Sequence, residues 1–163
     1  MKTGYETQLT RQIGEHLVVA KLGRLGIIAT PFAGNVPDFD LLASDLSGHS
    51  LPIQVKAING FAYQFSATAF LDIEFDGNNQ IVRRKKKLSN PDLIYVLVLL
   101  TPDENDKFFI MKVKDLQNHF FKVYKGGIRS KNPKSTHCAI WPKELTKYQD
   151  NWELITNHFD LKK

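Results

Sequence analysis

Two stretches decide the fold of this chain: Pro37-Asp38-Phe39-Asp40-Leu41-Leu42-Ala43 and Leu51-Pro52-Ile53-Gln54-Val55-Lys56-Ala57. Both alternate aliphatic residues with others at a period of two, and the polar run Asp45–Ser50 separates them, which predicts a tight β-hairpin. Side chains two residues apart on a strand point to the same face, so Gln54 and Lys56 share a face. Pairing around the turn then places Asp40 near Gln54.

A carboxylate, an amide oxygen and an ammonium group thus converge on an otherwise apolar sheet, where isolated charges are costly. Hydrolysis of a phosphodiester needs an activated water and a sink for developing negative charge, and Mg²⁺ held by oxygen ligands supplies both. We predict a Mg²⁺ site, with Mn²⁺ as a substitute. Asp40 is the principal ligand, and the Gln54 side-chain oxygen and the Val55 backbone carbonyl are further ligands. Lys56 faces the water and the scissile phosphate.

Other readings of the same residues stay open at this point. Asp38 has the parity to share a face with Asp40, but Asp40 borders the apolar strand directly. We therefore assign Asp38 an auxiliary role, although after Pro37 it also suits a turn. Lys56 also fits a solvent-facing lysine that protects an edge strand.

The composition narrows the class of protein. A length of 163 residues predicts one domain over 1–163. A formal charge of +5 and a pI near 9.3 favour a polyanionic partner such as nucleic acid. Cys138 is the only cysteine, so no intrachain disulfide forms, and we expect it to be a buried small hydrophobe. No signal peptide is expected, because the first residues, Met1–Glu6, have no apolar core, and no membrane span is expected, because the longest apolar run, Leu93–Leu100, is too short. These features predict a cytoplasmic protein without a membrane partner.

The remaining periodicities predict an α/β fold with a central mixed sheet flanked by helices. We expect helices over Thr7–Leu25, Lys114–Lys125 and Pro142–Phe159. Outside the hairpin, extended segments are expected from Ile27, over Phe61–Phe70 with a continuation to Phe75, and over Leu93–Leu100, Lys107–Val113 and Thr136–Trp141.

Three short motifs in this order resemble the PD-(D/E)xK nuclease superfamily, which includes restriction endonucleases and archaeal Holliday-junction resolvases. They are Gly14-Glu15-His16, Pro37-Asp38-Phe39-Asp40 and Gln54-Val55-Lys56. The resemblance covers roughly residues 10–60 with motif detail. It implies a restriction-endonuclease-like fold and a metal-dependent endonuclease that acts on DNA. It also implies that Glu15 is the helix carboxylate completing the metal site, and it allows a homodimer.

One departure from the superfamily pattern limits what the resemblance implies. Gln54 stands where an Asp or Glu is usual, which removes one negative charge from the metal site and weakens its affinity. Two alternatives therefore remain: an inactive nucleic-acid-binding module of the same fold, and a protein-interaction or structural domain. Glu15 is also explained by a helix ion pair with Arg11 one turn earlier.

Two basic stretches are candidates for contacts with nucleic acid. Each reads either as a solvated loop or as a set of phosphate contacts whose binding weakens steeply with salt. The candidate residues are Arg83, Arg84, Lys85, Lys86 and Lys87 in the first stretch, and Arg129, Lys131 and Lys134 in the second. The five histidines show no spacing typical of zinc ligands.

Overall fold

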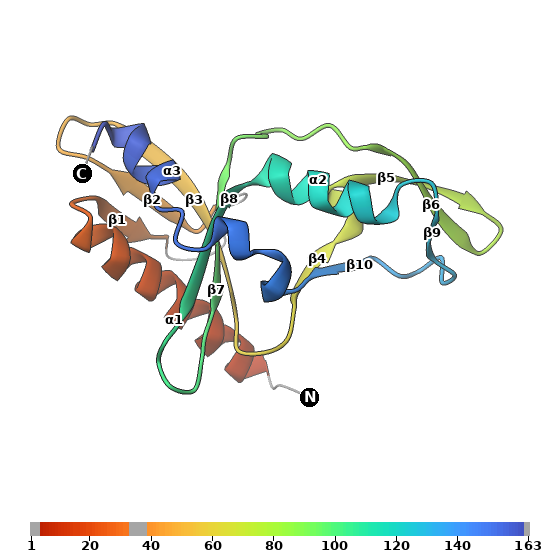
Figure 1. Ribbon diagram of the computed structural model, residues 1–163, viewed down its shortest axis with the longest axis horizontal. Coiled ribbons are helices and arrows are strands. Elements are labelled where there is room, and N and C mark those ends of the chain that lie inside the picture. The colour runs from red at the N-terminus through yellow and green to blue at the C-terminus, as the bar shows by residue number, and fades with distance from the viewer. Residues whose placement is uncertain (1–3, 33–38, 162–163) are drawn as a thin grey trace. The chain divides into compact units, whose positions relative to one another are not determined.

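The computed structural model describes residues 4–32 and 39–161 (Figure 1). Its Cα positions group into two compact units. Unit 1 comprises residues 1–63, 93–111 and 141–163, and unit 2 comprises residues 64–92 and 112–140. A single domain over 1–163 stays a prediction. Among the described helices, none combines the length and the apolar composition that a membrane crossing requires.

Unit 1 is built on a five-stranded mixed sheet with the order β1-β2-β3-β7-β8. The strands are β1 (Ile28–Pro31), β2 (Leu41–Ser44), β3 (Ser50–Ile58), β7 (Ile94–Leu99) and β8 (Lys107–Lys112). Antiparallel pairing joins β1 to β2 and β2 to β3, whereas β3 and β7 run parallel. With the long helix α1 (Gly4–Arg24) and the short α3 (Glu153–Thr156), this confirms the α/β class with a central mixed sheet flanked by helices.

The predicted hairpin forms with the expected register. Leu41 pairs with Ile53, so Asp40 lies one residue beyond β2 at the level of Gln54. Gly48 adopts a positive φ of 86° in the turn, and the Asp45 carboxylate accepts the Ser47 and His49 N–H groups, each at 2.9 Å. The hairpin therefore holds the three polar residues in one neighbourhood.

Helix α1 packs on β3 through apolar residues and one glycine. Val18 and Leu22 are fully buried and share a core cluster with Leu41, Ile53 and Val55. A Cβ atom at Gly14 would collide with the Ala57 side chain, so glycine at this position allows the helix to approach the strand closely. This approach brings residues 11 and 15 of the helix to the end of β2.

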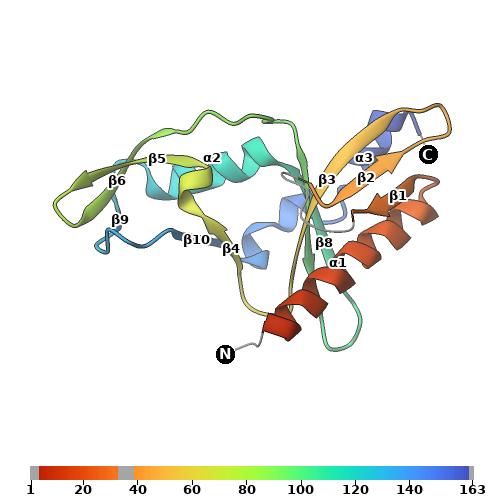
Figure 2. The ribbon, with the colours of Figure 1, turned by 180° about the vertical axis from the view of Figure 1, so that it is seen from behind.

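Unit 2 contains two small sheets and one amphipathic helix. β4 (Tyr63–Ser66) pairs with β10 (His137–Ile140), and β5 (Leu71–Asp76), β6 (Asn79–Lys85) and β9 (Ile128–Ser130) form an antiparallel sheet. α2 (Val113–Tyr124) lies along β5 and β6, as Figure 2 shows. The Phe65, Phe70 and Phe120 rings pack against one another with centroids 5.2–5.7 Å apart.

The structure corrects two element predictions. The strand expected over Phe61–Phe70 is only Tyr63–Ser66, followed by a 3-10 turn at Ala67–Ala69 and by a separate β5. The helix expected over Pro142–Phe159 is also wrong: the segment contains three short 3-10 helices and the four-residue α3. Asp150 has a left-handed φ of 52° and donates its N–H to the Phe108 carbonyl at 2.9 Å. Pairing with β8 replaces the helical hydrogen bonds there.

Candidate functional site

The sheet fixes the backbone of Asp40 on both sides. Its N–H donates to the Ile53 carbonyl at 2.9 Å, and its own carbonyl accepts the Phe32 N–H at 3.0 Å. Because these bonds anchor Asp40 to β3 and to the end of β1, its carboxylate has a defined position. The side chain retains only 10% of its exposure.

The Asp40 carboxylate accepts hydrogen bonds from three groups. Oδ2 receives the Val55 backbone N–H at 2.9 Å and the Gln54 side-chain NH₂, while Oδ1 receives the Arg11 guanidinium at 3.2 Å. The Gln54 amide therefore presents its nitrogen to Asp40. To act as a metal ligand through its oxygen, this amide must turn over.

Arg11 links the helix carboxylate to the strand carboxylate. Its Nε donates to Glu15 Oε1 at 2.7 Å while its terminal nitrogen contacts Asp40. The pKa of Arg11 is raised, first by the hydrogen bond with Glu15 and further by the charges of Glu15 and Asp40. Arg11 is 51% exposed, whereas the Glu15 side chain is 10% exposed. The ion pair expected from the sequence exists, but Glu15 is buried and shares its cation with Asp40.

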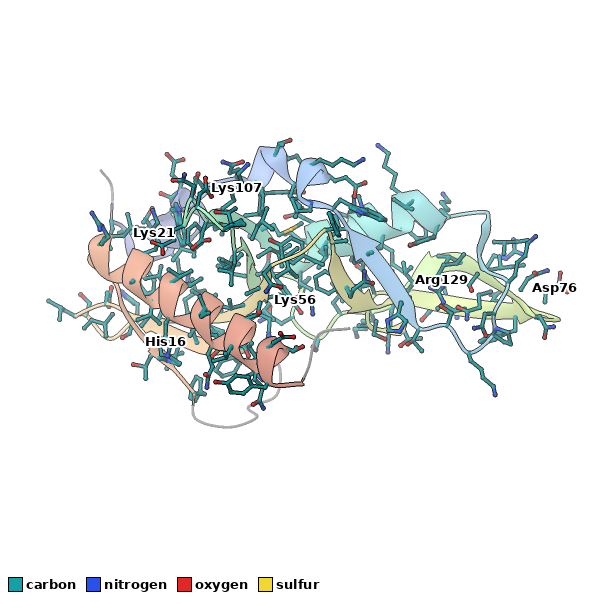
Figure 3. All side chains as sticks on the ribbon, turned by 90° about the horizontal axis from the view of Figure 1, so that it is seen from below. His16, Lys21, Lys56, Asp76, Lys107 and Arg129 are labelled. Carbon is teal, nitrogen blue, oxygen red and sulfur yellow. The ribbon has the colours of Figure 1, made fainter. Side chains whose placement is uncertain are left out.

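Lys56, labelled in Figure 3, is half-buried on β3. It lies two residues after Gln54 on the same strand, so the two side chains share a face. Burial lowers the pKa of Lys56 below its ordinary value, and the nearby Asp40 carboxylate opposes this shift. Leu97, its partner on β7, is fully buried. The ammonium therefore lies beside an apolar strand and within the electrostatic reach of Asp40, an arrangement that favours a neutral amine more than water does.

A hard divalent cation bound at this site would take oxygen ligands. Asp40, Glu15 and the Gln54 amide offer only oxygen ligands, and one guanidinium already bridges the two carboxylates. Over residues 4–32 and 39–161, no three His, Cys, Asp or Glu side chains gather closely enough to bind a metal. Asp38, the predicted auxiliary residue, lies outside the described part of the chain. The third oxygen ligand would therefore come from an amide or a backbone carbonyl.

The first basic stretch is mostly strand, not loop. Arg83, Arg84 and Lys85 belong to β6, and two of them form ion pairs across the hairpin with β5. Arg83 lies 3.4 Å from Glu74, and Arg84 lies 2.7 Å from Asp72. Lys86 donates to the Thr68 carbonyl at 3.0 Å, and Lys87 is exposed. The charge of the run is thus partly neutralised by its neighbours.

The second basic stretch is divided between one structural arginine and two exposed lysines. Arg129 donates to Gln80 Oε1, to the Ser135 carbonyl and to the His137 carbonyl. Gln80 is 1% exposed, so this arginine satisfies a buried amide and fastens the loop that follows β9. Arg129 is marked in Figure 3, and Lys131 and Lys134 remain exposed.

Sequence reasoning missed the contact between Arg11 and Asp40, which joins residues 29 positions apart. Cys138 is buried as predicted, and burial raises the pKa of its thiol to about 11. That environment makes it an unreactive core residue.

No protein-family model matches the chain, and no curated protein matches it. Among solved structures, a bacterial homing endonuclease, I-Ssp6803I, is similar over 94% of this chain and 95% of its own chain. The two sequences are 16% identical and the TM-score is 0.48.

Proposed function

We propose that this chain is a metal-dependent nuclease of the PD-(D/E)xK superfamily that hydrolyses DNA phosphodiester bonds. The observation that carries the proposal is the bridge from Arg11 to both Asp40 and Glu15. Two carboxylates from different elements gather on one cation, beside Gln54 and Lys56. The order of these residues along the chain agrees with the motifs of the superfamily.

Each residue has a chemical role in this proposal. Asp40, Glu15, the Gln54 amide oxygen and the Val55 carbonyl would hold Mg²⁺ or Mn²⁺. The ion would supply Lewis acidity and lower the pKa of its water. Lys56 would orient that water, accept its proton as a neutral amine, or stabilise negative charge on the phosphate when protonated. Its lowered pKa makes the neutral form more accessible near neutral pH.

A specific observation favours a second candidate, the inactive nucleic-acid-binding module. The Gln54 amide donates to Asp40, Arg11 pairs with both Asp40 and Glu15, and Lys56 lies within the electrostatic reach of Asp40. A polar cluster that is satisfied without metal has no electrostatic need to bind one. If the protein binds neither DNA nor metal, a protein-interaction or structural domain is the remaining interpretation.

The proposed partner is DNA, and the cleavage pattern informs on oligomeric state. One such site cuts one strand, so duplex scission requires two sites, as in a homodimer, or two successive nicks. Supercoiled plasmid converted directly to linear product favours paired sites. Accumulation of nicked circles favours a single site.

The test combines several DNA forms with metals and matched variants. Supercoiled, linear, single-stranded and branched DNA are incubated with Mg²⁺, Mn²⁺ or chelator. The proteins are wild type, Asp40→Asn, Lys56→Ala and the control Lys107→Ala, which removes an exposed lysine of β8. We expect metal-dependent cutting by wild type and the control, and at least about 100-fold slower cutting by the other two. Salt-sensitive binding without cutting would instead support the inactive module.

A further inference from the structure

The charge of this chain is unevenly divided between its two units. Unit 2 has twelve Lys and Arg against five Asp and Glu, a formal charge of +7, whereas unit 1 has ten against twelve, a charge of −2. The basic excess of the whole protein therefore resides in 58 residues that contain none of the candidate catalytic side chains. A positive field confined to one unit attracts a polyanion to that unit.

The arginines of the two basic stretches do not account for this excess. Arg83 and Arg84 are paired with Glu74 and Asp72 on the neighbouring strand, and Arg129 is bound to Gln80. Cations that are already paired lose much of their attraction for a phosphate. The charge available to a partner must come from residues of unit 2 other than these three arginines.

One face of α2 gathers such residues. Asn118, Phe121 and Lys122 follow the spacing i, i+3, i+4, which places them on one side of the helix, and Lys125 follows directly as the C-cap residue. Lys85 joins them from β6: its Nζ donates to Asn118 Oδ1 at 2.6 Å and lies 5.4 Å from the Phe121 ring centroid. Lys125 lies 5.5 Å from the same ring. We name these five residues the α2 basic face.

The opposite face of α2 holds the helix in place. Leu116 and Phe120 are fully buried, and the Gln117 amide donates to the Phe70 and Lys86 carbonyls at 2.8 and 2.7 Å. The one carboxylate of α2, Asp115, lies in its first turn and accepts the Lys112 N–H. The basic face is thus presented on a fixed helix, with the carboxylate at the other end.

We propose that the α2 basic face is a docking surface for duplex DNA, the substrate class of the proposed function on which this choice rests, and that it contacts backbone phosphates through Lys85, Lys122 and Lys125. Lys122 lies on α2, Lys125 caps its end and Lys85 lies on β6, so a fixed backbone carries the three lysines and less entropy is lost on binding. Asn118 adds an amide donor, and the ammonium groups of Lys85 and Lys125 both contact the half-buried Phe121 ring. The surface reads charge and not base sequence, since ammonium groups contact phosphates without specifying bases.

The proposal is tested by binding in the presence of chelator, which excludes cleavage. Fluorescence anisotropy measures affinity for a duplex DNA and a duplex RNA of equal length between about 50 and 200 mM salt. The variant is Lys85→Gln/Lys122→Gln/Lys125→Gln. A matched control removes three exposed lysines of unit 1, Lys107→Gln/Lys143→Gln/Lys147→Gln, and a second control is Arg83→Gln/Arg84→Gln.

Each phosphate that a lysine no longer neutralises lowers the slope of log affinity against log salt by about 0.9, so the α2 variant should lose about 2–3 units of slope. Its affinity for the duplex DNA should fall roughly tenfold or more, and both controls should change far less; a loss confined to the duplex RNA would overturn the proposal. Equal losses in the α2 variant and in the unit 1 control would overturn the proposal, as would absence of binding by wild type. Circular dichroism confirms folding of each variant. The result is separate from that of the nuclease proposal, because no metal or cleavage is involved.

Discussion

Replacement of Arg11 by glutamine tests whether its guanidinium occupies the position that a divalent metal would take. The change removes the only cation seen to bridge Glu15 and Asp40 in the described chain. Asp40 keeps the donors from Val55 and Gln54, so Glu15 is the carboxylate that loses most. Without metal, we expect the variant to be less stable.

The magnitude follows from the exposures of the three side chains. An exposed ion pair contributes about 0.2–1 kcal/mol, and breaking a fully buried one costs about 3–5 kcal/mol. Arg11 is 51% exposed and both carboxylates are 10% exposed, so the bridge falls between these limits. We expect a loss of about 1–2 kcal/mol in the metal-free protein.

Linkage then fixes the effect on metal binding. If metal must displace Arg11, breaking the bridge costs free energy, and metal binding to the wild type is weaker by that amount. Removing the bridge should tighten Mn²⁺ binding by about 5–30-fold, since about 1.4 kcal/mol is a factor of ten. The two proteins should become nearly equal in stability when saturated with metal.

The assays are urea unfolding with and without Mn²⁺ and calorimetric titration of chelator-treated protein with Mn²⁺. Arg24→Gln, an exposed arginine in the last turn of α1, is the control for charge removal from the helix. Unchanged or weakened Mn²⁺ affinity in a folded Arg11→Gln protein would refute the displacement. If wild type and variant both fail to bind Mn²⁺, the metal site itself is refuted.

Three other predictions follow from the same structure. Gln54→Glu should destabilise the metal-free protein by about 1–2 kcal/mol, because a carboxylate replaces the amide that donates to Asp40. The same variant should bind Mn²⁺ more tightly in the calorimetric titration. Weaker Mn²⁺ binding would contradict the role of residue 54 as a metal ligand. Gly14→Ala should cost about 1–3 kcal/mol in urea unfolding by pressing α1 off Ala57, whereas Gly23→Ala, which meets no neighbour, should be neutral or stabilising. An NMR titration should give His49 a pKa above its ordinary value because of the Asp45 hydrogen bond, and Asp45→Asn should remove that shift. The same hydrogen bond lowers the pKa of Asp45. The ion pair therefore stabilises the folded state between the folded pKa values of Asp45 and His49, and this stabilisation is lost as pH rises through the pKa of His49.

The sequence predicts the fold where local periodicity and burial agree. The period-two pattern around Asp40 and Gln54 fixes the hairpin register, because a shift by one residue would expose Leu41 and Ile53. The apolar run at Leu93–Leu100 forms β7 for the same reason, since both faces of that strand contact other residues. Asp40, Gln54 and Lys56 could be placed together from the chain alone.

Elsewhere, tertiary contacts decide the structure. The last predicted helix is interrupted because Asp150 bonds to the Phe108 carbonyl, about 40 residues earlier, which no local pattern reveals. β9 pairs with β6 over a stretch whose glycines and charges suggested a loop. Arg11 reaches Asp40 only because Gly14 lets α1 approach β3. The positive charge of the run Arg83–Lys87 could be predicted from the sequence, but its ion pairs with β5 could not.

The central claim is that Asp40, Glu15, Gln54 and Lys56 form a catalytic site for DNA hydrolysis. It is tested most directly by the single-turnover rate of duplex DNA cleavage in Mg²⁺, measured for wild type and Lys56→Ala at equal, saturating protein. We predict that the variant binds DNA as tightly as wild type but cuts about 10²–10⁴-fold more slowly. Equal cleavage rates, or no cleavage by wild type in either Mg²⁺ or Mn²⁺, would contradict the claim.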